Sequence, residues 1–237
     1  MQALRSTLFV VWMYGLMVVM GIILTPTLIG PRSWARGGFT VWRGLIFWGL
    51  RVLGGVTWEL RGAENLPEGG ALVACKHQSM FDTLAPWVFL NDPAIILKKE
   101  LKWLPIFGWW AQKLRNIAVD RSAASKALRD MTRQARARAA EGRQILIFPE
   151  GTRTGVDEQV DYKPGVAALY KAMDVPCIPV ALNSGLIWES FGKLKQPGRI
   201  IVEVLEPIPP GLDRKEFMAR LKTAIDTRTA ALVEEGV

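Results

Sequence analysis

Residues 71–82 have the sequence ALVACKHQSMFD, in which a short apolar run is followed at once by the one histidine of the chain, His77. On both sides of this stretch, apolar runs typical of strands alternate with amphipathic patterns typical of helices. We expect strands at 56–61, 71–76, 94–98, 117–119, 144–148, 177–182 and 200–205, and helices at 79–90, 123–141, 164–173 and 214–234. Strands separated by helices predict an α/β fold with a largely parallel central sheet and helices on both faces.

The residues that follow the 71–76 strand suit general-base chemistry. Sites in parallel α/β sheets form at the carboxyl ends of strands, which is where His77 stands. Asp82 lies five residues later, and Ser79-x-x-Asp82 has the form of a capping box, which predicts Asp82 in the first turn of a helix. There its carboxylate can accept the imidazole Nδ1–H and leave Nε2 as a general base. The spacing alone leaves open that Asp82 only caps the helix and that His77 is an incidental polar residue.

A second polar group follows the strand expected at 144–148. The sequence continues Pro149-Glu150-Gly151-Thr152-Arg153. Glycine lets the backbone approach a ligand closely, threonine donates a hydroxyl hydrogen bond, and arginine offers a planar fork for a phosphate. Taken alone, the same residues also fit a turn that ends in a solvated arginine.

The positive charge of the chain is concentrated near its N-terminus. The 237 residues have a net charge of +8, and residues 1–58 hold five arginines, five of the ten tryptophans and no acidic residue. Arginine and tryptophan beside apolar runs are typical of a membrane surface, whereas a nucleic-acid footprint needs a basic and polar face. We therefore expect no nucleic-acid partner, and we divide the chain into membrane-anchoring helices at 1–58 and an α/β domain at 59–237.

Two segments make up the expected anchor. Residues 6–31 carry no charge, and their centre at 8–24 is long enough to reach across or deep into a bilayer. Residues 39–58 predict a helix that lies in the interface, with Arg36, Arg43 and Arg51 within an arc of about 80°. A hairpin in one leaflet, a single span, and an apolar arm packed on the protein's own core all remain open.

The cysteine and histidine content excludes several classes of site. Two cysteines, Cys75 and Cys177, and one histidine cannot build a disulfide scaffold or a multi-histidine metal centre. Cys75 and His77 are two residues apart and could share a strand face, which leaves a thiol hydrolase as an alternative. The N-terminal quarter alone would suffice for a lipid-surface protein without enzymatic activity.

Taken together, the His-x4-Asp motif of His77 and Asp82 and the sequence 148–153 (FPEGTR) resemble the glycerolipid acyltransferase family, in particular bacterial 1-acylglycerol-3-phosphate acyltransferases. The resemblance covers roughly residues 60–185 and extends to Lys98 and its neighbours at 99–101, to 119–121 and to 175–180. Lys76 stands where many members of the family have asparagine. The implied substrate-binding residues are Lys98, Arg121, Glu150, Gly151, Thr152 and Arg153.

The resemblance also implies a reaction. His77, held by Asp82, would activate the free hydroxyl of lysophosphatidic acid for attack on an acyl thioester, acyl-CoA or acyl-ACP, and phosphatidic acid would be the product. Neither a metal nor a cofactor is implied beyond that co-substrate. The expected location is a bacterial inner membrane, with the α/β domain facing the cytoplasm. Another lysolipid acceptor, such as a lyso-ornithine lipid, remains an alternative within the family.

Overall fold

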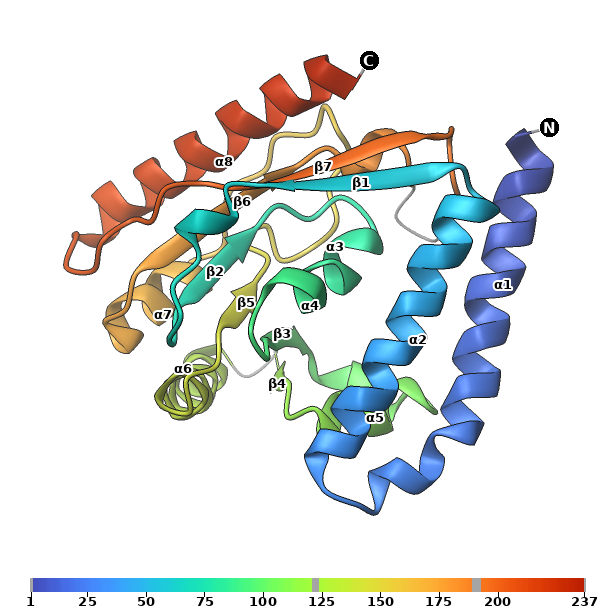
Figure 1. Ribbon diagram of the computed structural model, residues 1–237. Coiled ribbons are helices and arrows are strands. Elements are labelled where there is room, and N and C mark those ends of the chain that lie inside the picture. The colour runs from blue at the N-terminus through green and yellow to red at the C-terminus, as the bar shows by residue number, and fades with distance from the viewer. Residues whose placement is uncertain (1, 121–123, 189–192, 237) are drawn as a thin grey trace.

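The structure is a computed structural model that describes residues 2–120, 124–188 and 193–236 (Figure 1). Its centre is a seven-stranded sheet with the order β1-β7-β6-β2-β5-β3-β4, in which the β6–β7 pair is antiparallel and the other pairs are parallel. The strands are β1 (Val56–Arg61), β2 (Leu72–Cys75), β3 (Ala94–Lys98), β4 (Ile117–Val119), β5 (Ile145–Ile147), β6 (Cys177–Leu182) and β7 (Gly198–Val204). The expected α/β fold with a largely parallel sheet is confirmed.

Helices cover both faces of this sheet. The α-helices are α1 (Gln2–Ile23), α2 (Arg32–Val52), α3 (Phe81–Leu84), α4 (Pro86–Phe89), α5 (Phe107–Lys113), α6 (Ala124–Ala140), α7 (Gly165–Met173) and α8 (Arg214–Gly236). Short 3-10 turns are η1 (Thr25–Leu28), η2 (Ala63–Asn65), η3 (Lys99–Trp103) and η5 (Ser184–Leu186). Helices α1 to α4 pack on one face, and α6, α7 and α8 pack on the other.

Strand β2 shows how the sequence builds this three-layer core. Successive strand residues point to opposite faces, and all four residues of β2 are buried. Val73 and Cys75 belong to the cluster formed with α1 to α4, whereas Leu72 and Ala74 belong to the cluster formed with α6, α7 and α8. The apolar run 71–75 is therefore continuous because both of its faces are covered.

The two N-terminal helices form a hairpin along one side of the molecule (Figure 1). Phe9 of α1 is buried edge-on against Trp188, with 5.1 Å between the ring centroids, and Ser6 accepts a hydrogen bond from the Leu194 amide at 2.9 Å. The opposite side of α1 is exposed and apolar, and it includes Leu4, Leu8, Val11, Val18, Val19, Ile22 and Ile23. The hairpin thus contributes to the core and also presents a long apolar surface.

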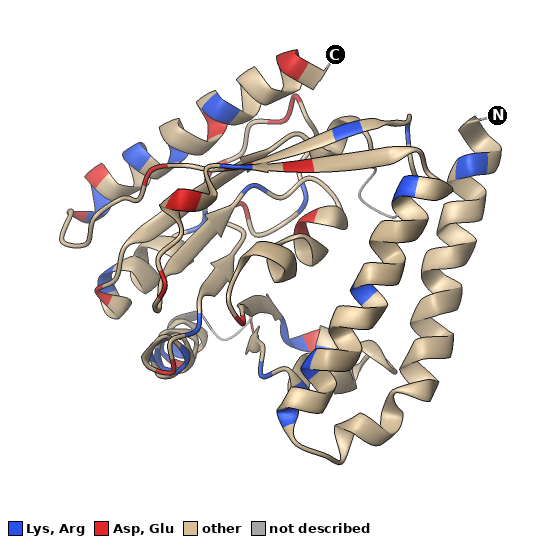
Figure 2. Cartoon of the chain, in the orientation of Figure 1, with Lys and Arg blue, Asp and Glu red and all other residues tan. Residues whose placement is uncertain are grey.

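Charged residues are sparse on this hairpin, and Figure 2 shows no acidic position on either helix. Helix α2 begins at Arg32, earlier than expected, and three of its arginines contact the α/β body. Arg32 and Arg36 pair with Asp92 at 2.5 Å and 3.6 Å, and Arg43 donates to the Trp87 carbonyl. Part of the expected arginine face is therefore engaged by the half-buried 87–92 turn, whereas Arg51 is exposed, and lipid contact by this face stays a prediction.

Two other features differ from the sequence-based expectation. The helix expected at 79–90 is divided into α3 and α4, because Pro86 has no N–H for the carbonyl of Asp82. Helix α5 is not among the expected helices. Strand β1 has the expected bounds, and because it begins before residue 59, the division of the chain at residue 58 stays a prediction.

Candidate active site

His77 and Asp82 meet at the carboxyl end of β2. The imidazole Nδ1 lies 3.2 Å from Asp82 Oδ2. The His77 side chain is 12% exposed, and that of Asp82 is fully buried. His77 is in the turn after the strand, and Asp82 is in the first turn of α3. The two side chains can meet because the chain is not helical between them.

Further donors from the turn and from η5 hold the Asp82 carboxylate. Oδ2 accepts from the amides of Gln78 at 2.5 Å and Ser79 at 2.7 Å, and Oδ1 accepts from the Ser184 hydroxyl at 2.6 Å. The Ser79 amide bond is the backward half of the predicted capping box, and the Ser79 hydroxyl accepts from the Phe81 amide at 3.2 Å. A carboxylate fixed in this way orients the His77 ring, with Nδ1 toward the protein and Nε2 available for a substrate.

The loop after β5 packs directly on His77. The rings of His77 and Phe148 are stacked, with centroids 3.9 Å apart and an interplanar angle of 18°. The amide and hydroxyl of Thr154 both donate to the His77 carbonyl, at 2.9 Å and 3.2 Å. The two motifs are therefore parts of one structure, although about 70 residues separate them in the chain.

The glycine and arginine of that loop lie at the edge of the site. Gly151 has a φ of 72°, a conformation that side-chain-bearing residues rarely adopt. Thr152 is exposed and Arg153 is partly buried. Burial lowers the pKa of the Arg153 guanidinium, and the negative charge of Asp82 opposes this shift. Arg153 directly precedes Thr154, which binds the His77 carbonyl, so the loop brings it to the edge of the base pair.

Glu150 points inward instead. Its Oε1 lies 3.3 Å from Lys76 Nζ and accepts from the His77 amide at 3.4 Å, and its Oε2 is buried without a partner among the described residues. Burial raises the pKa of Glu150 to about 7, although the Lys76 charge opposes the shift. This geometry favours a positioning role for Glu150 over direct contact with a substrate.

Lys76 connects Glu150 to the C-terminal helix. Its ammonium also lies 3.3 Å from Asp226 of α8, which accepts from the Tyr162 hydroxyl at 2.9 Å and from Lys222 at 2.5 Å. Burial would raise the pKa of Asp226, but these partners lower it below its usual value. Lys76 is therefore a buried side chain between two acidic residues, Glu150 and Asp226.

The other predicted residues are placed as follows. Lys98 ends β3 and is exposed, and because β3 pairs with β5 and β5 with β2, it lies on the same edge of the sheet as His77. Arg121 lies outside the described residues. Cys75 is buried in the core, and burial raises the pKa of its thiol well above the usual value. Because the thiolate is the reactive form, this placement argues against a Cys75 nucleophile.

Ser184 and Asp226 were missed from the sequence. Ser184 follows β6, which runs parallel to β2, so Asn183-Ser184-Gly185 could have been identified as polar residues at the same sheet edge. Asp226 follows no strand, and its position on an amphipathic helix carries no comparable signal.

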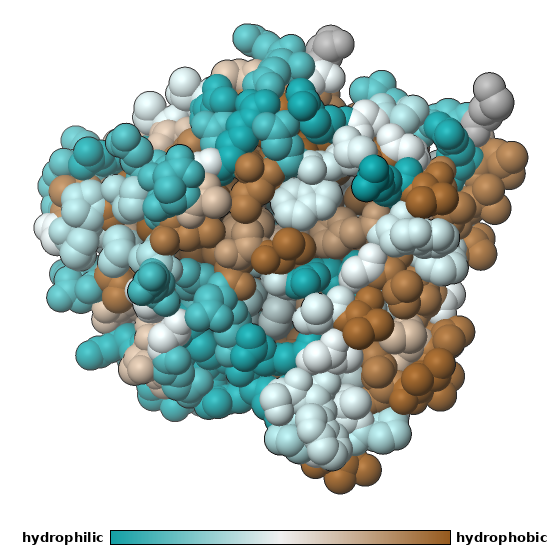
Figure 3. Space-filling model, in the orientation of Figure 1, coloured by the Kyte–Doolittle hydropathy of each residue, from teal (hydrophilic) through white to brown (hydrophobic). Residues whose placement is uncertain are grey.

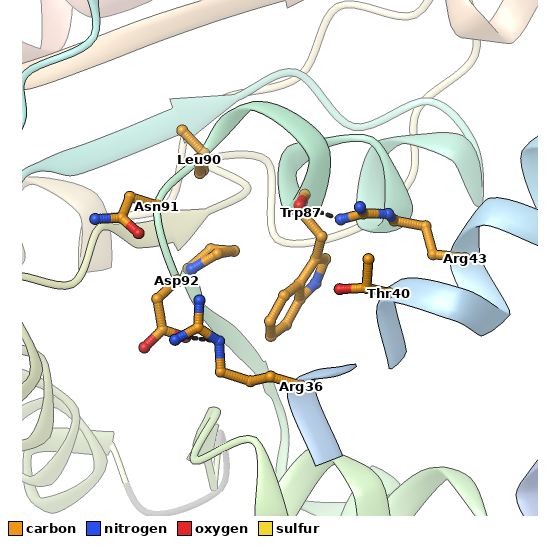
Figure 4. A pocket seen from close by; sticks show the side chains of 8 residues that line it. Arg36, Thr40, Arg43, Trp87, Leu90, Asn91 and Asp92 are labelled. Carbon is orange, nitrogen blue, oxygen red and sulfur yellow. Dashed lines mark hydrogen bonds and ion pairs between the residues drawn. The ribbon is translucent and has the colours of Figure 1, made fainter. Parts of the chain in front are cut away.

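A small pocket of about 80 Å³ lies between α2 and the turn before β3 (Figure 4). Its lining residues are Arg36, Thr40, Arg43, Trp87, Leu90, Asn91, Asp92 and Pro93. This pocket is at the amino end of β3, whereas Lys98 is at the carboxyl end, so it is separate from the His77 site.

Comparisons with known proteins identify related chains and a related fold. The model of a family described as Acyltransferase matches residues 57–183. The chain is 35% identical to the 1-acyl-sn-glycerol-3-phosphate acyltransferase of Pseudomonas aeruginosa, over 99% of this chain and 90% of that protein. It is 30% identical to the 1-acyl-sn-glycerol-3-phosphate acyltransferase alpha of Mus musculus, over 67% of this chain and 57% of that protein. The crystal structure of the 1-acyl-sn-glycerophosphate (LPA) acyltransferase PlsC from Thermotoga maritima shares the fold, with a TM-score of 0.80, 20% identity and 98% coverage of both chains.

Proposed function

This chain belongs to the acyltransferase family, and we propose that it transfers an acyl chain to the sn-2 hydroxyl of 1-acyl-sn-glycerol-3-phosphate, giving phosphatidic acid. The observation that carries the proposal is the pair of His77 and Asp82, 3.2 Å apart, with the 148–154 loop bound to the His77 carbonyl through Thr154. The names of the relatives supply the acceptor, and the base pair and the phosphate-fitted arginine are compatible with it.

The reaction follows from the placement of His77. Nε2 takes the proton of the acceptor hydroxyl as its oxygen attacks the carbonyl carbon of an acyl thioester, acyl-CoA or acyl-ACP. The C–S bond breaks, and the leaving thiolate takes up the proton that His77 holds. Asp82 stabilises the imidazolium between these two transfers. The acyl chain passes directly from sulfur to oxygen, so no covalent acyl-enzyme is required.

The acceptor phosphate is assigned to the basic residues of the family's motifs. Arg153 offers two parallel N–H groups, Lys98 supplies further positive charge from the same sheet edge, and Arg121 is included from its sequence motif alone. Gly151 keeps the backbone free of a side chain where the headgroup approaches, and Thr152 offers a hydroxyl. Glu150 acts through the His77 amide and Lys76, as a positioning residue.

The N-terminal hairpin is assigned to one leaflet of the membrane. Helix α1 has the length and apolar character of a membrane span. It is, however, tied to the body along its length, by Ser6 and Phe9 near one end and by Gly21 against Ile106 near the other. A full crossing would carry the α/β body into the bilayer, so a one-leaflet hairpin fits better. In a bacterial cell the matching location is the inner membrane with the body in the cytoplasm, where acyl thioesters are made.

A panel assay tests this function. The purified full-length chain in detergent would be given 1-acyl-glycerol-3-phosphate, lysophosphatidylethanolamine or a lyso-ornithine lipid, each with acyl-CoA or acyl-ACP, and the products identified by mass spectrometry. We expect phosphatidic acid to form fastest. A faster reaction with a phosphate-free acceptor would overturn the acceptor assignment, and thioester hydrolysis without transfer would overturn the reaction class.

A further inference from the structure

Lipid contact is not confined to the N-terminal hairpin: we propose that η3 and α5, residues 99–113, form a second membrane-binding surface on the α/β body. Its partner is the headgroup and upper acyl region of an anionic bilayer. Four large apolar side chains of this segment are exposed: Trp103 by 82%, Trp109 by 49%, Leu104 by 48% and Phe107 by 42%. So many exposed aromatic and aliphatic groups within seven residues are unusual for a water-facing surface.

The backbone that presents these side chains is tightly packed. A Cβ on Gly108 would stand 2.1 Å from the carbonyl oxygen of Lys102, so the turn closes here only with glycine. Ile106 has a φ of 64°, a costly conformation for a β-branched residue. The fold therefore maintains a specific local shape here, in which the neighbouring large apolar side chains face outward.

This surface is joined to the hairpin. The side chain of Ile106 occupies the space beside Gly21, where a Cβ would come within 2.4 Å of it. Lys113 Nζ donates to the Gly30 carbonyl at 2.5 Å, and Arg32 donates to the Leu114 carbonyl at 3.1 Å. The segment therefore lies at the loop end of the hairpin (Figure 1), where Ile29 and Trp34 are 91% and 60% exposed. Figure 3 shows apolar surface along α1 and a smaller apolar patch at the tip of the hairpin.

The charges around the surface favour a membrane over a protein partner. Lys98, Lys99, Lys102 and Lys113 stand in or beside the segment with Glu100, and Asp120 pairs with Lys99 at 3.0 Å, which gives a net charge of 4 − 2 = +2. Lysine is depleted in protein interfaces. Tryptophan and phenylalanine with flanking lysines are instead the composition of interfacial membrane elements, where the cations meet anionic headgroups.

The position of this surface connects it with the site. The segment follows Lys98 directly, and Lys98 shares a sheet edge with His77. Binding through both the hairpin and this segment would hold the carboxyl edge of the sheet at headgroup level. Lipid contact by this segment does not depend on which lysolipid is the acceptor.

Single labels on the full-length chain test the proposal. Cys75 and Cys177 are buried, so a polarity-sensitive fluorophore can be attached to Trp103→Cys, to Leu8→Cys on α1, or to Leu128→Cys on α6. Leu128 is the matched control, because it is also an exposed apolar side chain, at 37%, but lies on a helix of the opposite face of the sheet. Each labelled protein would be reconstituted on phosphatidylglycerol-containing vesicles with spin-labelled lipid as quencher.

We expect the labels at 8 and 103 to shift to the blue and to lose most of their fluorescence to the quencher, while the label at 128 stays unquenched. If the label at position 8 is quenched but the label at position 103 stays unquenched like the control at 128, the proposed second membrane surface is overturned. The membrane contact of the N-terminal hairpin would then still stand. Equal quenching at all three positions would also overturn it, because the effect would then be unspecific. Acyl transfer by the labelled proteins in detergent is a separate readout, and its absence would count against the function and not against this surface.

Discussion

Replacing Glu150 with glutamine should remove one pH-dependent contribution to stability. The carboxyl is 1% exposed, and burial raises its pKa from 4.5 to about 7. An acid whose pKa is raised by folding binds more protons in the folded chain than in the unfolded chain. The contribution of Glu150 to the free energy of unfolding is therefore fully present below about pH 4.5 and is lost as the pH rises through 7. Glutamine has nearly the same shape and does not titrate.

The size of this effect follows from the same two values. The pKa of Glu150 rises from 4.5 to about 7 on folding, which at 1.4 kcal/mol per tenfold change corresponds to about 3 kcal/mol. For a chain of 237 residues this is roughly 6–12 °C in melting temperature. The difference in free energy of unfolding between Glu150→Gln and the wild type should change by this amount between pH 4.5 and pH 8. The variant should become the relatively more stable protein as the pH rises.

The assay is thermal unfolding of both proteins in detergent, followed by circular dichroism across that pH range. Lys76 and Asp226 are present in both proteins, so the difference between the two curves isolates the ionisation of Glu150. Parallel curves would refute the reasoning, because they would show that the buried carboxyl titrates alike in the folded and unfolded chains.

Substitutions at four residues test the site. Ser184→Ala removes one of the donors to Asp82 and should lower kcat several-fold in the transfer assay. Asp82→Asn should lower kcat by about 10² to 10⁴, because the amide cannot stabilise the imidazolium. Equal losses of kcat in the two variants would contradict this ranking. Arg153→Ala should raise the KM for the acceptor and leave that for the thioester nearly unchanged, with partial rescue by lysine; an equal rise in both constants would indicate a donor contact. Cys75→Ser should keep most of the activity, and a trapped acyl-cysteine would refute that expectation.

The fold and the base pair could be predicted because their signals are local. The strand at 71–76 has a continuous apolar run, and the capping box places Asp82 next to His77 within a few residues. The four residues between His77 and Asp82 are enough to specify the turn that joins them. The strand at 94–98 has the expected bounds, and its apolar run lies between two neighbouring strands, β5 and β4.

Long-range partners explain what could not be predicted. Ser184 bonds Asp82 across 102 residues, and Asp226 meets Lys76 across 150. Arg32 of α2 contacts the body because it donates to Asp92, which lies 60 residues away in the chain. Helix α5 is short, and its apolar residues surround it, so it has no amphipathic period.

The most direct test of the central claim is the rate of acyl transfer by His77→Ala with 1-acyl-glycerol-3-phosphate and the better thioester donor. The chain has no second histidine, and loss of a positioned general base typically lowers the rate by about 10² to 10⁴. We predict a fall of that size with an unchanged melting temperature. A folded His77→Ala protein with activity within about threefold of wild type, far less than the loss expected for a base, would contradict the assignment of His77 as the base.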